Sequence, residues 1–134
     1  MASPPQELVE LVRKRARSRC EYCRLPEFGT RAAFEIEHVV TRKHHGRTVA
    51  SNLAWSCPFC NRHKGPNLSG IDPQTGVMER LFDPRHDRWA QHFELRGAVI
   101  TGRTPVGRTT VDVLCINAEK MVILRTQLIG LGIW

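Results

Sequence analysis

The chain has 134 residues, a formal net charge of +7 and 41% hydrophobic residues. This length suits one domain with a modest core, and the basic charge favours a polyanionic partner. The amino terminus lacks a positively charged start and a long apolar run, so no secretory signal is expected. The apolar stretch 128–134 is far shorter than the roughly 20 residues needed to cross a bilayer. We therefore expect a cytoplasmic protein.

Four of the cysteines form two pairs with two-residue gaps, Cys20/Cys23 and Cys57/Cys60. Each such pair places two sulfurs on one side of an ion, which is the usual way to hold a tetrahedral structural Zn²⁺. The alternative is that these cysteines are small core residues or disulfide partners. The paired spacing favours zinc, which would tie distant segments of a small core together. Cys115 has apolar neighbours and no paired cysteine, which predicts a buried thiol.

The amino-terminal segment predicts a helix that leads to Cys20. Ser3 and Gln6 fit a capping box, and apolar residues then recur at helical spacing. Basic side chains crowd the rest of its surface: Arg13, Lys14, Arg15, Arg17 and Arg19. This cationic face either contacts phosphate groups or is simply solvated.

Between the cysteine pairs, the pattern predicts a strand, a loop and a second strand. Residues 33–40 alternate in part between apolar and charged residues, the basic stretch 41–47 reads as a loop, and residues 52–56 lead back towards Cys57. A short helix then opens at Cys60 and ends before Gly65-Pro66. We expect these elements to wrap around a metal.

Three polar residues near the cysteines suit the hydrolysis of a phosphodiester bond. His38 can accept a proton from an attacking water, because a neutral imidazole titrates near neutrality. Glu37 and Asn61 offer oxygen ligands to a hard divalent ion such as Mg²⁺. Asn52 can tie unpaired backbone groups across a turn and so hold His38 at a fixed angle. Neighbouring residues on an ideal strand face opposite ways, so we expect a bend at Glu37-His38.

These residues resemble a known family. Glu37-His38, Asn52 and the run from Cys57 to Gly65 are similar to the HNH endonucleases, and the likeness extends to the segments 65–73, 81–85 and 104–108. The resemblance implies a ββα-metal (His-Me finger) core with a four-cysteine zinc site. It also implies His38 as general base, Glu37 and Asn61 on a catalytic divalent ion, Asn52 as a brace, and products with a 5′-phosphate and a 3′-hydroxyl.

Basic residues around this core are candidates for contact with nucleic acid. They are Arg42, Lys43, Arg47, Arg62 and Lys64. His63 could be an additional metal ligand, contact a phosphate, or be solvated. Duplex DNA is the expected substrate, with RNA as an alternative.

The second half of the chain predicts a supporting platform. We expect a strand within 77–82, a short helix within 87–92, a hairpin over 93–101 and a last helix capped by Asn117. Thr104-Pro105 fits the start of a helix, and the β-branched residues that follow leave a strand as the alternative. The fold class is α+β, with one domain over 1–134, a core motif at about 20–65 and a platform at about 66–134. Asp83 stands where similar proteins often have histidine.

The sequence thus predicts a zinc-stabilised, metal-dependent endonuclease that cuts DNA. The alternative is a non-catalytic, zinc-stabilised module that binds nucleic acid through the same charge. A third interpretation is an interaction protein whose catalytic centre has lost its activity.

Overall fold

A computed structural model describes residues 3–134, so the expected domain boundary at residue 1 lies outside the described residues. The fold is mixed α+β, as predicted. In chain order its elements are α1 (Gln6–Arg15), η1 (Glu27–Gly29), β1 (Glu35–His38), η2 (Arg42–His44), η3 (Ala50–Asn52), β2 (Leu53–Ser56), α2 (Pro58–Lys64), β3 (Ser69–Ile71), β4 (Met78–Arg80), α3 (Trp89–His92), β5 (Phe93–Arg96), β6 (Val99–Gly102), α4 (Pro105–Val113) and α5 (Glu119–Gly130).

The strand, loop and strand predicted between the cysteine pairs are present, and the helix expected to open at Cys60 begins two residues earlier, at Pro58. Strands β1 and β2 pair antiparallel, with His38 opposite Leu53 and Glu35 opposite Ser56. Helix α2 follows β2 directly, because Pro58 at its first turn needs no backbone donor and the Cys57 sulfur accepts the N–H of Cys60. It ends at Gly65, whose φ of 50° is in the left-handed region that glycine tolerates.

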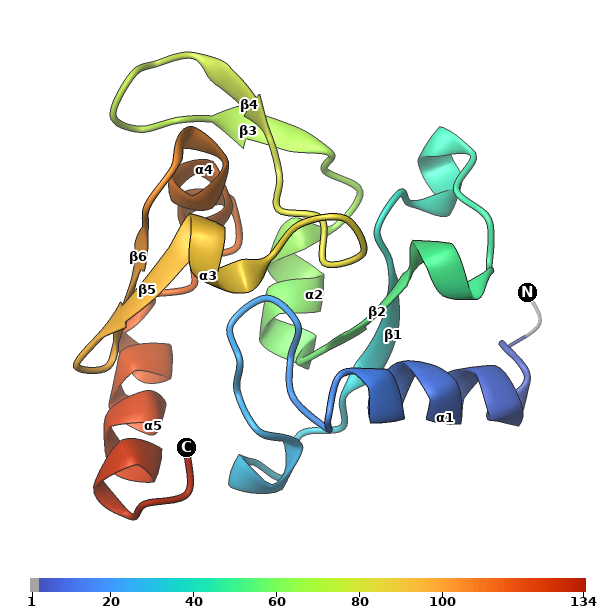
Figure 1. Ribbon diagram of the computed structural model, residues 1–134, viewed down its shortest axis with the longest axis horizontal. Helices are drawn as coiled ribbons and strands as arrows, with labels where there is room; N and C mark the ends of the chain where they lie inside the picture. Colours follow the sequence, from blue (N-terminus) through green and yellow to red (C-terminus); the bar gives the residue numbers. More distant parts are fainter. Residues whose placement is uncertain (1–2) are drawn as a thin grey trace.

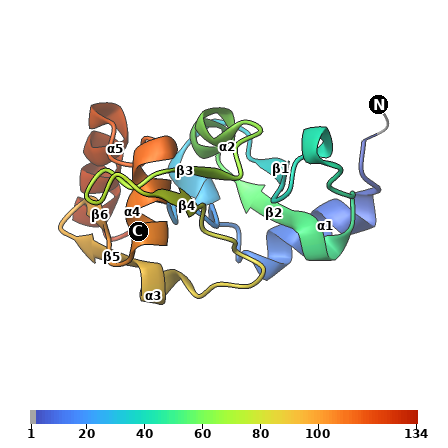
Figure 2. The same cartoon turned by 90° about the horizontal axis from the view of Figure 1, so that it is seen from above.

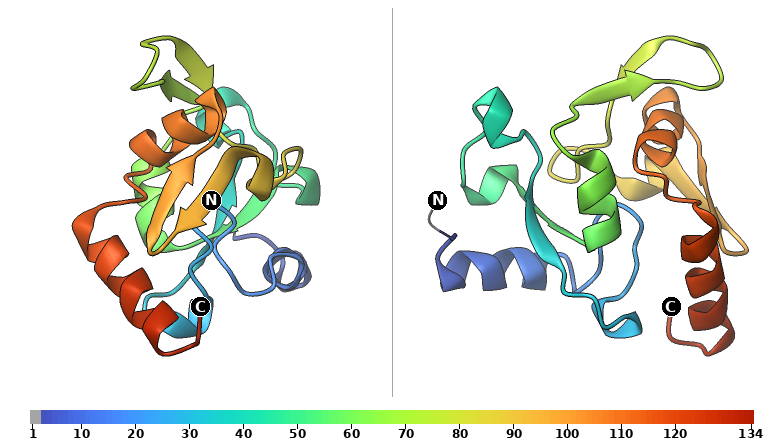
Figure 3. Two further views of the ribbon diagram at one scale, coloured as in Figure 1. Left: turned by 60° about the vertical axis from the view of Figure 1, so that its left-hand side comes forward. Right: turned by 180° about the vertical axis from the view of Figure 1, so that it is seen from behind.

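The hairpin β1–β2 and helix α2 lie between α1 at one end of the molecule and the carboxyl-terminal elements at the other (Figures 1 and 2). From behind, α2 is seen between the hairpin and the α4–α5 side (Figure 3, right). The core therefore runs along the molecule, and its fully buried members include Val12 of α1, Leu53 of β2 and Ile100 of β6.

Aromatic side chains join the first cysteine pair to the second half of the chain. The Tyr22 and Phe82 rings meet edge to face with centroids 6.3 Å apart, and Phe82 meets Phe93 at 5.1 Å. The indole N–H of Trp89 donates to the Tyr22 carbonyl at 2.8 Å. Aromatic contacts of this kind stabilise beyond the area they bury. The carboxyl-terminal elements thus pack against the segment that carries Cys20 and Cys23.

The helix starts were predicted with mixed success. The Thr104 hydroxyl caps α4 by accepting the Gly107 N–H at 3.0 Å, as predicted. The prediction of a capping box formed by Ser3 and Gln6 is wrong, because α1 begins after Pro5 without a side-chain cap. Asn117 does not cap α5 either, since its amide group bonds both backbone groups of Ile100 instead.

The supporting elements differ from the expected ones in detail. The hairpin over 93–101 is confirmed as β5 and β6, and the strand expected within 77–82 is the short β4, paired with β3. Cys115 is exposed, so the expected buried thiol is wrong. It follows α4 at a φ of 50°, where the N–H of Ile116 reaches back to the Val111 carbonyl and turns the chain.

Over residues 3–134, none of the helices combines the length and the apolar composition that crossing a membrane requires.

Candidate metal centre and active site

The two cysteine pairs converge on one buried point. The four sulfurs of Cys20, Cys23, Cys57 and Cys60 all lie within 4.8 Å of one another. Sulfurs bound tetrahedrally at about 2.3 Å from zinc lie about 3.8 Å apart. The distance between the Cys23 and Cys57 sulfurs is 3.8 Å, so the cluster already has the size that zinc needs. This agrees with a structural zinc site and not with isolated core thiols.

The charge around the cluster also suits a cation and its thiolates. Burial opposes ionisation of Cys20, but hydrogen bonds from the other three thiols outweigh it and lower its pKa well below the ordinary value. Hydrogen bonding to Cys20 in turn raises the pKa of Cys60. The buried guanidinium of Arg125 stabilises negative charge on the cluster, and its own pKa is lowered by burial.

Glu37 lies on the side of β1 that faces α2. Its Oε2 accepts a 2.7 Å hydrogen bond from the Tyr22 hydroxyl, and its Oε1 lies 2.5 Å from the ammonium of Lys64. Burial raises the pKa of Glu37, and the charge of Lys64 opposes that rise. The negative charge of the Glu37 carboxylate is therefore already compensated by the ammonium of Lys64.

Lys64 is 1% exposed, so the expectation that it contacts nucleic acid is wrong in this structure. Its ammonium donates to the backbone carbonyls of His38 at 3.3 Å and Val39 at 3.0 Å, in addition to pairing with Glu37. A buried lysine requires such partners. Lys64 therefore fixes the backbone at the end of β1.

His38 is the last residue of β1, and its side chain has different neighbours from that of Glu37. The ring nitrogen Nε2 lies 2.9 Å from the Thr48 hydroxyl. The expected bend at Glu37-His38 is wrong: β1 simply ends at His38, and the two side chains alternate as in an ordinary strand. Partial burial lowers the pKa of His38, as do the charges of Arg42 and Lys64. These effects favour the neutral form of the imidazole.

Asn52 closes the loop between the strands. Its Oδ1 accepts the Val40 N–H at 2.9 Å, and its Nδ2 donates to the carbonyls of Val40 at 2.9 Å and Arg47 at 2.8 Å. Gly46 packs so closely here that a β-carbon would lie 1.6 Å from the Val40 carbonyl oxygen. The loop that follows His38 is thus fixed by a side-chain amide and by a residue without a side chain.

Asn61 and Lys64 are three residues apart on α2 and share the face towards β1. The Asn61 amide donates to the carboxylate of Glu35 at 3.0 Å, so Glu35 joins this face two residues before Glu37. His63 points elsewhere: its Nδ1 donates to the Phe59 carbonyl at 2.8 Å and its ring lies 4.2 Å from that of Phe59. The structure therefore brings Glu37 and Asn61 to one face and leaves His63 away from it.

The other basic candidates are on the surface. Arg42, Lys43 and Arg47 are exposed in the loop after β1, and Arg62 is exposed on α2. They are placed where a polyanion could reach them.

Sequence reasoning missed Tyr22, Thr48 and Glu35. Tyr22 could have been noticed as one of the two residues between paired cysteines, where a buried hydroxyl needs a partner. Thr48 gives no signal in the sequence, because its contact with His38 depends on the path of the loop.

Comparisons with known proteins agree with this geometry. A sequence profile described as HNH endonuclease matches residues 20–67. The chain is 28% identical over 115 residues to the Septu protein PtuB of Bacillus thuringiensis, an alignment that covers 84% of this chain and 42% of that protein. The chain thus spans less than half the length of that relative. No solved structure matches the chain significantly.

The profile begins at the first zinc-type cysteine and ends just after α2, so it covers the cysteine cluster, His38, the Asn52 brace and the Glu37–Asn61 face together. The family implies a ββα-metal fold for this part of the chain, which the order β1, β2, α2 matches. Residues 20–67 therefore form an HNH endonuclease domain.

Proposed function

We propose that this protein is a metal-dependent endonuclease that hydrolyses DNA phosphodiester bonds. Its single domain over 1–134 would consist of a core motif at about 20–65 and an accessory platform at about 66–134. The observation that carries the proposal is the position of His38, whose partly exposed imidazole lies at the end of β1 inside the segment that matches the family. Burial lowers its pKa, which favours the neutral form. Such a group can act as a general base at physiological pH.

The proposed step uses His38 on a water molecule beside the phosphate. The imidazole takes one proton from the water, the resulting hydroxide oxygen bonds to phosphorus, and the bond from phosphorus to the 3′ oxygen breaks. The 3′ oxygen then takes a proton from solvent, which leaves a 5′-phosphate and a 3′-hydroxyl. Thr48 and the Asn52-braced loop hold the ring for this transfer.

The residues present fit a divalent ion at Glu37 and Asn61. Oε1 of Glu37 is buried without a hydrogen bond of good geometry among the described residues, and the ammonium of Lys64 lies beside it as a cation would. One carboxylate oxygen and one amide oxygen suit a hard ion such as Mg²⁺, which keeps several waters. When bound, the ion would supply positive charge beside the phosphate oxygens.

The exposed arginines and lysines would hold the nucleic acid through its backbone. Arg42, Lys43 and Arg47 follow His38 directly in the chain, and Arg62 follows Asn61. A contact of this kind positions a substrate without reading its sequence.

Cleavage of supercoiled plasmid tests the proposal. The parent protein is expected to cut in Mg²⁺ or Mn²⁺, and His38→Ala is expected to lose about 10²- to 10⁴-fold in rate, which is the usual contribution of a general base. Exposed His44→Ala, in the same loop, is the matched control and should cut at the parent rate. Equal rates for the parent and His38→Ala would reject the assignment.

One observation favours the second candidate, a zinc-stabilised module that binds nucleic acid without cutting it. Lys64 already neutralises Glu37, so a divalent ion must displace an ammonium to bind there. Titration with Mn²⁺ separates the two functions. The nuclease should bind the ion and lose that binding in Glu37→Gln and Asn61→Ala, whereas the module should show no such site.

A further inference from the structure

The loop after β4 contributes to a basic pocket that the proposed active site does not use. An open pocket of about 430 Å³ is lined by Arg15 at the end of α1, Ser51 in η3, and Pro84, Arg85 and His86 in the loop. Its lining residues among those described include two arginines, a histidine and a hydroxyl, and no carboxylate. This set of donors is suited to an anion.

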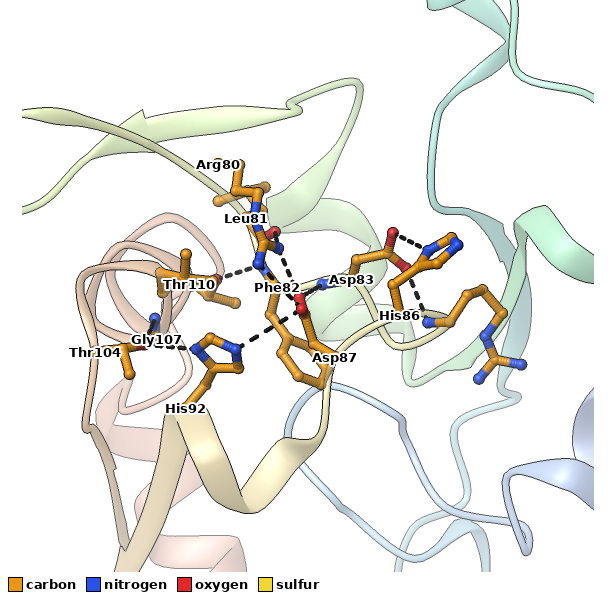
Figure 4. A network of polar contacts seen from close by, with 12 residues as sticks. Arg80, Leu81, Phe82, Asp83, His86, Asp87, His92, Thr104, Gly107 and Thr110 are labelled. Atoms are coloured by element: carbon orange, nitrogen blue, oxygen red, sulfur yellow. Dashed lines mark hydrogen bonds and ion pairs between the residues drawn. The ribbon is translucent and has the colours of Figure 1, made fainter.

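Two acidic residues hold the pocket together from outside it. Oε1 of Glu21 pairs with a terminal nitrogen of Arg85, and Oε2 of Glu21 accepts the Trp55 N–H at 2.8 Å. Oδ2 of Asp83 lies 2.8 Å from Nδ1 of His86 (Figure 4). A carboxylate on Nδ1 orients the ring, so its Nε2 is the nitrogen available to a ligand.

The arginines retain unused capacity for an anion. The Arg85 side chain is nine-tenths buried, and its Nε has no hydrogen-bond partner among residues 3–134. Buried polar groups are normally paired, so this N–H is a donor that a ligand or an ordered water would satisfy. Arg15 donates one terminal nitrogen to the Leu53 carbonyl at 2.8 Å and remains exposed. Burial lowers the pKa of Arg15, and the charge of Arg85 lowers it further, a repulsion that an anion would relieve.

The pocket lies beside the strands that carry the proposed base. Leu53, which accepts the Arg15 hydrogen bond, is the residue paired with His38 across β1 and β2. Ser51 precedes Asn52, which braces the loop after His38. Anything bound by Arg15 and Ser51 is therefore close to the end of β1.

We infer that Arg15, Ser51, Arg85 and His86 form a binding site for a phosphate group, and that its source is the backbone of the nucleic acid next to the bond to be cut. Planar guanidinium groups bind phosphate through two parallel hydrogen bonds. The assignment of the backbone as the source rests on the proposed nuclease function, whereas the affinity of the pocket for phosphate does not.

Equilibrium binding of a fluorescent DNA duplex tests the site. All variants carry His38→Ala, so that binding is measured without cleavage and the result does not depend on the proposed catalysis. Arg15→Gln and His86→Gln are expected to bind more weakly, Arg15→Gln by about five- to tenfold and equally for unrelated sequences. Arg15→Gln should also reduce the slope of log K against log salt by about one.

Two matched variants control for general charge and for folding. Arg96→Gln removes an exposed arginine from the β5–β6 hairpin and should leave affinity and slope unchanged. Arg15→Lys keeps the charge and should retain most of the salt slope while losing part of the affinity. Arg85 is left intact, because its pairing with buried Glu21 makes a folding defect the expected result of its replacement.

A second arm separates the two sources of phosphate. Inorganic phosphate added to the His38→Ala protein should compete with the duplex and raise the melting temperature, and adding Arg15→Gln should abolish both effects. If phosphate acts through Arg15 but the duplex binds all variants equally, the pocket takes a free anion and the backbone assignment is overturned. If neither ligand responds to Arg15→Gln and His86→Gln, the site itself is rejected.

Discussion

The ammonium of Lys64 and the carboxylate of Glu37 lie 2.5 Å apart, and their side chains are 2% and 3% exposed. The attraction is strong at this depth, but each group has lost its hydration, so the net gain is far smaller than the attraction itself. The pair is held further by the Tyr22 hydroxyl and by two backbone carbonyls. Breaking it from either side leaves an uncompensated buried charge.

Lys64→Met should therefore lower the free energy of unfolding by about 3–5 kcal/mol at pH 8. Burial already holds the pKa of Glu37 in the folded parent above its unfolded value of about 4.3, and loss of the ammonium raises it further. The loss of unfolding free energy is fully present above the pKa of Glu37 in the folded variant, and it shrinks as the pH falls towards the pKa of Glu37 in the unfolded chain. Urea unfolding at pH 5 and pH 8 measures both effects.

The double variant Glu37→Gln/Lys64→Met is the control, because it removes both charges and should recover most of the lost stability. A Lys64→Met protein as stable as the parent at pH 8 would show that the buried pair is not a real contact.

Zinc removal should unfold the protein around the cysteine cluster. Metal analysis is expected to find one zinc per chain, and a strong chelator should lower the melting temperature, because zinc binding and folding are coupled in such sites. Cys57→Ser should lose the metal and the cooperative transition. Cys115→Ser, which changes the exposed cysteine outside the cluster, should keep both, and loss of zinc from that variant would contradict the assignment.

The turn between β3 and β4 should make stability depend on acid pH. Both guanidinium nitrogens of Arg108 that face Asp72 donate to its carboxylate, at 3.1 and 2.9 Å, and lower its pKa to about 2. Because the unfolded value is about 3.9, the ion pair stabilises the fold fully above about pH 4 and this contribution disappears as the pH falls towards 2. The difference in unfolding free energy between the parent and Asp72→Asn should shrink over that range. A difference that stays constant would be the contrary result.

The pKa of His38 should respond to Arg42. In the free protein its ring should titrate below the ordinary 6.5, because burial and the charges of Arg42 and Lys64 disfavour the imidazolium. The acidic limb of the cleavage profile then lies below pH 6.5. Arg42→Gln should move the NMR titration of His38 and this limb to higher pH, whereas Arg96→Gln should move neither. An unchanged midpoint in Arg42→Gln would remove Arg42 from the explanation.

Asn52 should be a positioning residue. Asn52→Ala removes three hydrogen bonds to the backbone of Val40 and Arg47 and should cost about 1–3 kcal/mol of stability. If the loop fixes His38 for its proposed role, kcat should fall well beyond the effect on stability while KM changes little. Asn52→Asp keeps the acceptor for the Val40 N–H, so its unfolding free energy should lie between those of the parent and Asn52→Ala. A variant with altered KM and a normal kcat would assign Asn52 to substrate binding instead.

The zinc cluster, the order of β1, β2 and α2, and the hairpin of β5 and β6 could be read from the sequence because each rests on local spacing. Paired cysteines, alternating residues and a Pro or Gly at an element end act within a few positions. The same spacing placed Glu37, His38, Asn52 and Asn61 as one group of candidates.

The errors arose where distant residues decide. Lysines are usually exposed, and nothing near Lys64 in the sequence indicates that it pairs with Glu37, 27 positions earlier. Asn117 has a good capping side chain, but Ile100 of the neighbouring hairpin takes its amide. Cys115 has apolar neighbours, yet its own left-handed backbone conformation after α4 leaves its side chain exposed. Tertiary contacts override the local pattern in each case.

The two residues between Cys20 and Cys23 hold different parts of the molecule. Glu21 secures Arg85 in the basic pocket, and Tyr22 secures Glu37 behind the proposed base. Oxidation or zinc starvation that opens this short knuckle would release both at the same moment. The fold around the cluster, the surroundings of the proposed base and the basic pocket would thus all depend on the supply of one ion.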